Sequence, residues 1–112
     1  MTGQKFPREA KLVQKSEFDL VYRAGKRRSS SHFTIFVRAS GQPISRFGFS
    51  IKKALGGAVV RNRIRRRLRE MVRRHRQEIP AGWDIVIHPK NKVATAEFAA
   101  LAEELVRLLK KL

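Results

Sequence analysis

The chain has 112 residues, of which 26 are lysine or arginine and 9 are acidic, so that its net charge is +17. With 42% hydrophobic residues it can form a core, and its length fits one domain over residues 1–112. The lack of cysteine excludes disulfides and thiolate metal sites. The charge predicts a polyanionic partner that is bound in a salt-sensitive way. The sequence shows neither a signal-peptide core nor a membrane-spanning apolar run, so we expect a cytoplasmic protein with no membrane partner.

The first quarter of the chain predicts an extended basic arm and a short helix. Residues 1–11 are polar and basic, which is typical of a flexible arm. Ser16 is suited to cap the helix that follows, and Gly25 is suited to end it. Phe18 and Tyr22 lie four residues apart and so share one face of this helix. By spacing alone, such an aromatic pair is more typical of a core than of a ligand-binding surface.

Two alternating strands are predicted next, after a basic connector, residues 26–31, with room for a short edge strand. Residues 32–39 place Phe36 on the outer face, where it suits base stacking unless a helix covers it. Residues 46–52 repeat the alternation and place Gly48 on the outer face, which keeps that surface shallow. The side chains assigned to the core are Phe33, Ile35, Val37, Phe47, Phe49 and Ile51. The two strands are expected to be neighbours that share one polar, basic face. That face is expected to carry Thr34, Phe36, Arg38, Arg46, Gly48, Ser50 and Lys52.

Residues 58–77 predict a long helix that is apolar on one side and cationic on the other. Its apolar stripe consists of Val60, Ile64, Leu68, Met71 and Val72, with Ile79 just beyond. Nine arginines lie between Arg61 and Arg76, and Glu70 is the only acid among them, so this side repels itself unless a polyanion covers it. A solvated charged face is the alternative, but the forked guanidinium of arginine favours phosphate and hence a nucleic acid. An anionic membrane is disfavoured because no long apolar face carries exposed Trp or Phe beside the arginines.

The last third of the chain predicts a central strand and a structural helix. Residues 83–87 are expected to be central in the sheet because their apolar run has no polar break. Residues 96–112 predict a final helix capped by Thr95. Its apolar stripe is formed by Phe98, Leu101, Leu105, Leu108 and Leu109.

The sequence offers little for catalysis. His75 and Glu78 lie three residues apart at a helix end, which is weak evidence for a metal and more typical of a solvated pair. No cluster of carboxylates suits two-metal nuclease chemistry, and no phosphate-binding loop is present. From the residues alone the chain is a nucleic-acid-binding protein, and chemistry in which it takes part is expected to lie elsewhere.

A resemblance to a known family rests on residues 48–66. The matching segments are Gly48-Phe49-Ser50-Ile51-Lys52-Lys53, Gly56, Ala58-Val59 and Arg61-Asn62-Arg63-Ile64-Arg65-Arg66. The Arg-Asn-Arg signature, which opens a basic helix soon after a glycine-rich turn, is highly specific. With weaker matches on either side, the similarity covers residues 11–112. The chain resembles the protein component of bacterial ribonuclease P.

The resemblance implies a fold that periodicity alone does not give. The family is a single-domain α/β sandwich with the order αβββαβα, similar to certain ribosomal proteins and to domain IV of an elongation factor. The strands that flank the arginine helix are parallel in this family, and a left-handed βαβ crossover joins them. The usual handedness rule predicts the opposite.

The resemblance also implies a function. The partners are the catalytic RNA of ribonuclease P and precursor tRNA, whose single-stranded 5′ leader is removed in a Mg²⁺-dependent endonucleolytic step. The Mg²⁺ is expected to be bound mainly by the RNA, and the protein alone is not expected to be catalytic. Six residues of the signature helix match RNA-binding positions: Arg61, Asn62, Arg63, Arg65, Arg66 and Arg69. Six more match the leader cleft or its rim: Phe18, Tyr22, Phe36, Ser50, Lys52 and Lys53.

Two positions depart from the family pattern. Ala54 stands where a second basic residue is common, and Arg67 stands where an apolar residue is common. We expect the stem of Arg67 to pack beside the apolar stripe while its charge reaches solvent. The alternative function is a ribosomal or other structural RNA-binding protein with no role in catalysis. A protein-only nuclease is disfavoured by the missing carboxylates.

Overall fold

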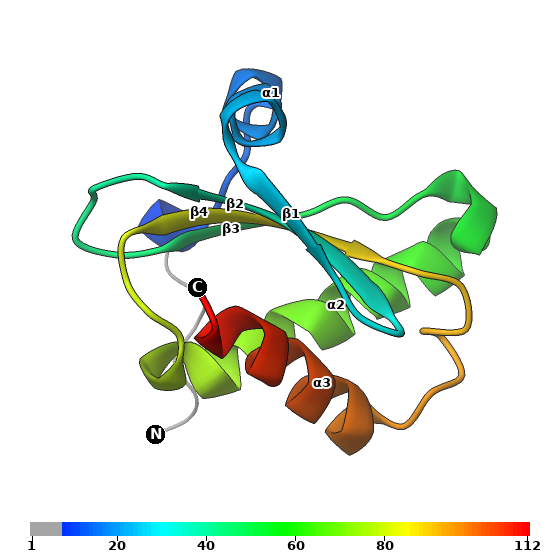
Figure 1. Ribbon diagram of the computed structural model, residues 1–112. Helices are drawn as coiled ribbons and strands as arrows, with labels where there is room; N and C mark the ends of the chain where they lie inside the picture. Colours follow the sequence, from blue (N-terminus) through cyan, green and yellow to red (C-terminus); the bar gives the residue numbers. More distant parts are fainter. Residues whose placement is uncertain (1–7) are drawn as a thin grey trace.

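The computed structural model describes residues 8–112, in which one four-stranded sheet separates α1 from α2 and α3 (Figure 1). The helices are α1 (Lys15–Ala24), α2 (Ala58–His75) and α3 (Phe98–Lys110). The strands are β1 (Lys26–Ser29), β2 (Phe33–Ala39), β3 (Arg46–Phe49) and β4 (Trp83–Pro89). Short 3₁₀ helices occupy Arg8–Ala10, Lys53–Leu55 and Arg76–Glu78. The expected order αβββαβα is confirmed.

The strand order in the sheet is β1-β2-β4-β3. β4 is therefore central, as its apolar run predicted, and it pairs antiparallel with β2 and parallel with β3. The expectation that the strands 32–39 and 46–52 are neighbours is wrong, because β4 lies between them. Because β4 is buried on both faces, its backbone N–H and C=O groups are shielded from water, and a partner strand on each side pairs them. The parallel strands β3 and β4 are joined through α2, as the resemblance implied.

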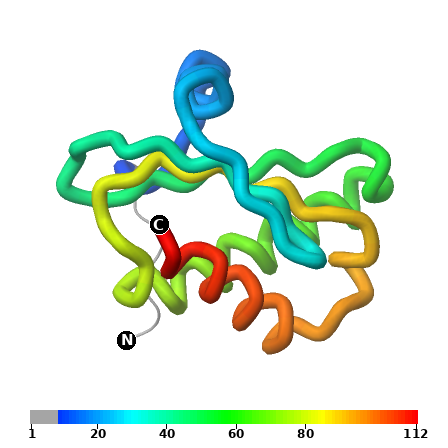
Figure 2. Tube along the Cα trace, viewed as in Figure 1, coloured from blue at the N-terminus to red at the C-terminus, as the bar shows by residue number. Residues whose placement is uncertain are grey.

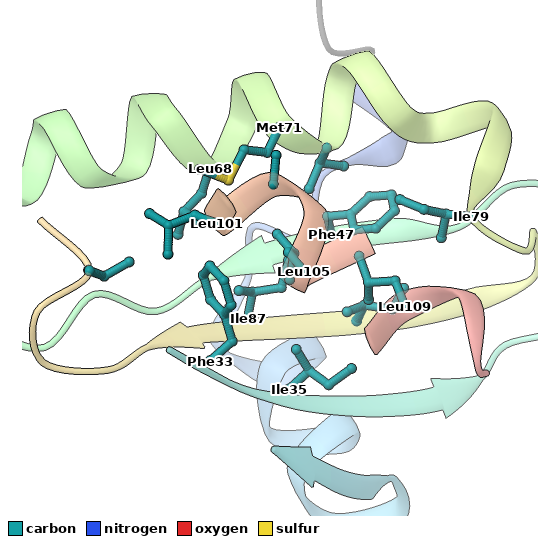
Figure 3. Close-up of a cluster of buried hydrophobic side chains, with 14 of the residues drawn as sticks. Phe33, Ile35, Phe47, Leu68, Met71, Ile79, Ile87, Leu101, Leu105 and Leu109 are labelled. Atoms are coloured by element: carbon teal, nitrogen blue, oxygen red, sulfur yellow. The ribbon is translucent and has the colours of Figure 1, made fainter. Parts of the chain in front are cut away.

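The helices α2 and α3 lie on the same face of the sheet (Figure 2), and the main core lies between them and the sheet (Figure 3). The inward residues of β2, the stripe of α2 and the stripe of α3 all contribute to it, which confirms the periodicities. Its most buried members include Phe33, Ile35, Leu68, Met71, Ile85, Ile87, Leu101, Leu105 and Leu109. Val60, Phe98 and Leu108 are only partly buried at its margin.

A second, smaller cluster holds α1 against the opposite face of the sheet. Val21 and Val86 are fully buried there, and Phe18 and Phe36 pack against them. Gly48 lies directly beneath Phe18, since a Cβ added to Gly48 would stand 2.5 Å from Phe18 Cζ. Gly48 thus lies on the face opposite the main core, as predicted, but it is buried there and allows a close approach of α1.

Two helix starts differ from the prediction. α1 begins after Gln14 rather than at Ser16, because Glu17 Oε1 accepts the backbone N–H of Gln14 at 3.0 Å and so closes the first turn. α3 begins after Glu97 rather than at Thr95, whose hydroxyl instead donates to the Lys92 carbonyl at 3.3 Å. Both competing caps lie within three residues of the predicted ones. The predicted end of α1 at Gly25 is confirmed.

The predicted arm and the predicted exposure of Arg67 are also corrected. Residues 8–10 form a 3₁₀ helix and Lys11 bridges Phe47 on the edge of β3, so the expected extended arm is wrong for this part. Residues 1–7 lie outside the described part of the chain. The guanidinium of Arg67 donates to the carbonyl of Ala96 at 2.9 Å and lies 5.7 Å from the Phe98 ring centroid. Its charge therefore fastens the segment before α3 instead of reaching solvent.

Within residues 8–112, no helix is both long and apolar enough to cross a membrane.

Replacing Leu68 with alanine should lower the free energy of unfolding by roughly 2–5 kcal/mol, because this side chain is 1% exposed and its loss leaves a cavity. Chemical denaturation with detection by circular dichroism measures the change. Arg63→Ala is the matched control, since it alters an exposed residue of the same helix and should change stability little. An equal loss in both variants would contradict the assigned stripe.

Candidate nucleic-acid interface

On the sheet face that α1 covers, residues that are paired across neighbouring strands line up in rows. Phe36, Val86 and Gly48 are aligned across β2, β4 and β3 and form the central row. Phe18 and Val21 of α1 rest on this row. One row on either side of it remains, and the two differ in charge.

The row on one side is a network of matched charges. Asp84, 1% exposed, accepts two hydrogen bonds from Arg46, at 2.9 and 2.8 Å, and lies 3.4 Å from Arg38 Nη1. Arg46 also donates to Glu17 Oε2 at 2.8 Å and so ties α1 to the sheet. Backbone N–H donors, first that of Gln14, and then the Arg46 guanidinium hold the pKa of Glu17 below its usual range. With two cations facing two acids, this row fastens α1 and leaves little charge for an external anion.

The row on the other side holds Thr34 and His88, and the His88 ring joins Phe36 of the central row and Tyr22 of α1 in an aromatic group at the end of α1. The Tyr22 and Phe36 centroids lie 5.0 Å apart in an edge-to-face arrangement, and the His88 ring lies 5.3 Å from Phe36. Tyr22 Oη is 2.9 Å from His88 Nε2. Burial raises the pKa of Tyr22, which the neighbouring Ser50 hydroxyl partly opposes through a hydrogen bond. Tyr22 is nevertheless 38% exposed, so part of this group faces solvent.

His88 was missed in the sequence analysis, which placed no function on it. The signal that could have found it is its position in β4, two residues beyond Val86 and therefore on the same face. The register confirms this placement, because His88 pairs with Thr34 in the row next to Phe36.

A surface cavity of about 610 Å³ opens beside the aromatic group. Phe36 and His88 form part of its wall, and Arg27, Lys52 and Lys90 supply its charge. None of the described residues that line it is acidic. The cavity thus combines ring surface with unmatched positive charge, which suits a single-stranded nucleic acid.

Lys52 and Lys53 are separated by the local structure. β3 ends at Phe49, so Lys52 is not on a strand, and the predicted alternation of faces does not extend to it. Lys52 lines the cavity, whereas Lys53 begins a 3₁₀ helix. Ala54, the departure from the family pattern, contributes an uncharged part of the cavity wall.

The cationic side of α2 divides into an unmatched and a matched part. Near its start, Arg63, Arg66 and Arg69 are exposed, and no carboxylate within residues 8–112 pairs with them. Asn62 Oδ1 accepts a hydrogen bond from Arg65 Nη1 at 3.1 Å and so orients this arginine. Arg61 donates to the Gly56 carbonyl at 3.0 Å and so holds the turn before the helix.

Near the end of α2, Glu70 offsets two of the arginines. Its carboxylate accepts hydrogen bonds from Arg73 and from Arg74, the latter at 2.7 Å. Arg73 first, and then Arg74, lower the pKa of Glu70 to about 2. The uncompensated charge of the helix therefore lies in its first two-thirds.

A smaller cavity, of about 270 Å³, connects the two faces of the sheet around the edge strand β3. Phe18 of α1 and Arg65 and Arg69 of α2 all line it, although the two helices lie on opposite faces (Figure 1). The structure thus brings Phe18 near the arginine helix, and it brings Tyr22, Phe36, Ser50 and Lys52 together around His88. Lys53 lines neither cavity.

The remaining histidines have structural partners. His75 Nδ1 lies 2.6 Å from Glu78, whose other oxygen is 3.2 Å from Lys110, in agreement with the expected solvated pair at the surface. His32 Nδ1 lies 2.8 Å from Glu104 and so joins α3 to the turn before β2. Within the described part of the chain, no three His, Asp or Glu side chains are grouped as metal ligands.

Comparison with known proteins finds similarity to one family over almost the whole chain. The family model described as Ribonuclease P matches residues 6–112. The protein named "Ribonuclease P protein component" from Thermotoga maritima is 33% identical over 113 residues, covering 97% of each chain. A relative of the same name from Desulfovibrio desulfuricans is 38% identical, over 95% of this chain and 85% of its own length.

The fold agrees as well. The solved structure of the RNase P protein from Thermotoga maritima superposes with a TM-score of 0.86 and 33% identity, covering 91% of this chain and 96% of its own. The chain therefore belongs to the ribonuclease P protein family, the protein components of a ribonucleoprotein nuclease of tRNA processing.

Proposed function

We propose that this chain binds the catalytic RNA of ribonuclease P through the first two-thirds of α2 and holds the single-stranded 5′ leader of precursor tRNA in the cleft between α1 and the sheet. The observation that carries the proposal is the aromatic group at the end of α1, beside a cavity whose charged groups are all basic. In this role the protein assists the Mg²⁺-dependent removal of the leader in the cytoplasm.

The cleft suits a strand of variable sequence. Base stacking on aromatic rings contributes about 1–3 kcal/mol per base and tolerates every base. Tyr22 and Phe36 supply rings, and Lys52 and Arg27 supply charge for the backbone phosphates. Stacking does not require amide or carboxylate groups that would select particular bases. This fits leaders whose nucleotide sequence differs from one tRNA to the next.

The arginines of α2 suit a folded RNA. Guanidinium groups bind phosphate with two parallel donors, and Arg63, Arg66 and Arg69 have no competing acid among the described residues. The smaller cavity, which Phe18 and Arg65 both line, reaches from α1 to this helix. A leader in the cleft and an RNA on α2 would then be held next to each other.

The proposal leaves hydrolysis to the RNA and its Mg²⁺ ions, and gives the protein the tasks of binding and orienting. The carboxylates of α1 and of the sheet beneath it lie beside cations, since Glu17 and Asp84 both pair with Arg46 and Asp19 lies 3.9 Å from Lys15. The alternative, a structural RNA-binding protein, would need α2 but not the cleft. Comparing substrates with and without a leader separates the two.

Replacing Phe36 with leucine should weaken binding of leader-bearing precursor tRNA to the holoenzyme by roughly 5- to 100-fold, because a stacking ring is lost while apolar cover is kept. Binding of a leaderless tRNA should stay the same. Filter binding with a substrate blocked at the cleavage site measures both affinities.

Phe98→Leu is the matched control for this experiment, since it makes the same change on α3, on the other side of the sheet. It should leave the ratio of the two affinities unchanged. Equal weakening of both substrates by Phe36→Leu would point to the structural RNA-binding alternative.

Replacing Arg66 with alanine should weaken binding of the ribonuclease P RNA and make its salt dependence shallower, by about one unit of slope for one lost phosphate contact. Affinity measured over a series of salt concentrations gives the slope. Arg107→Ala removes the same charge from α3, where Arg107 lies near Glu103, and should leave the slope nearly unchanged. An equal slope of the salt dependence in Arg66→Ala and in the unmodified protein would contradict a phosphate contact by Arg66.

A further inference from the structure

His88 is a half-buried titratable side chain that joins the aromatic group to the larger cavity. Its Nε2 lies 2.9 Å from Tyr22 Oη, and its ring contacts Phe36. The same ring forms part of the cavity wall. An anion in that cavity would therefore be next to an imidazole whose charge can change near neutral pH.

The groups around His88 oppose its protonation in the free protein. Lys52 follows β3, Lys90 follows β4 and Arg27 lies on β1, and all three line the same cavity. Burial first, and then the charge of Lys52, lower the pKa of His88. β2 presents only uncharged Thr34 and Phe36 to this ring.

α1 presents Tyr22, whose pKa is raised, so it stays neutral in the physiological range. The acid on this side of α1 is Asp19, which influences Tyr22 and lies 3.9 Å from Lys15 on the exposed surface. His88 is thus uncharged in the free protein at neutral pH, in a site that otherwise carries positive charge.

We propose that binding of the RNA leader is coupled to the uptake of one proton by His88. A backbone phosphodiester that enters the cavity between His88, Lys52 and Arg27 reverses the sign of the local field, and His88 takes a proton from the solvent to become a third cation facing that phosphate. This inference rests on the proposed binding of the leader in the cleft and identifies His88 as a ligand of its backbone.

The contact with Tyr22 is compatible with both charge states. Neutral His88 accepts the Tyr22 O–H at Nε2, whereas the imidazolium donates from Nε2 to the Tyr22 oxygen, because a hydroxyl can act in either way. Protonation therefore needs no change in the arrangement of the rings. Only the charge that faces the cavity changes.

The sign of the pH dependence follows from linkage. The pKa of His88 is lower in the free protein than in the complex, so the complex holds more protons between these two values. Affinity for the leader then rises as the pH falls through that interval and is level above and below it. The gain is about tenfold for each unit by which the phosphate raises the pKa.

The test compares the holoenzyme's affinities for leader-bearing and leaderless precursor tRNA from about pH 5.5 to pH 8, using substrates blocked at the cleavage site. The ratio of the two affinities is expected to rise several-fold as the pH falls. In His88→Gln the ratio should be independent of pH. Tyr22→Phe is the matched control, because it removes the hydroxyl partner, keeps His88 and should retain the pH dependence.

A second measurement covers the case in which His88→Gln does not fold. Nuclear magnetic resonance of the His88 ring in the unmodified protein gives its pKa before and after addition of a single-stranded leader oligoribonucleotide. The pKa is expected to rise on binding. An unchanged pKa, or a ratio above one that does not vary with pH, would overturn the coupling and leave the leader cleft intact. A ratio of one at every pH would instead overturn the leader cleft itself, and the coupling with it.

Discussion

The burial of β4 on both of its faces is the constraint on which the rest of the structure depends. Ile85 and Ile87 are fully buried on one side, and Val86 is fully buried on the other. The first side is covered by α2 and α3 together, whereas the described residues that cover the second are chiefly those of α1, a helix of ten residues, with Leu12 just before it (Figure 1). Because so short a helix leaves part of that face uncovered, Tyr22, Phe36 and His88 form a partly exposed aromatic surface at its end. The cleft is therefore a consequence of unequal cover on the two faces.

The distribution of acids decides which cations are available to a ligand. Asp84 and Glu17 are placed against Arg46, and Glu70 is placed against Arg73 and Arg74, so these arginines stabilise the fold. Among residues 8–112, most cations lie beyond salt-bridge distance of any carboxylate. The unmatched ones gather at the cavity beside β1 and on the first two-thirds of α2, which is where an RNA is proposed to bind.

Local patterns predicted the elements well, and long-range features less well. The stripes of α2 and α3, the central place of β4 and the end of α1 at Gly25 all follow from short-range spacing. The insertion of β4 between β2 and β3 does not, because strand pairing joins residues far apart in the chain, and the alternation is the same for either neighbour.

In the candidate site, too, sequence spacing revealed some residues, whereas others are placed there by contacts between distant parts of the chain. The resemblance named Tyr22, Phe36 and Lys52, but His88 joins them only through the register of β4 with β2. Phe18 and Arg65 come close because β3 is an edge strand, and residues from both faces of the sheet line the same cavity around it. Arg67 binds carbonyls of a loop 27 to 29 residues away, which no helical periodicity reveals.

The most direct test is the cleavage of precursor tRNA by a bacterial ribonuclease P RNA at low Mg²⁺, with and without this protein, on substrates with and without a 5′ leader. Strong stimulation, together with a gain in affinity for the leader-bearing substrate alone, is the result expected of a subunit that holds the leader in the cleft. Salt-sensitive RNA binding without stimulation, or with an equal effect on both substrates, would contradict it.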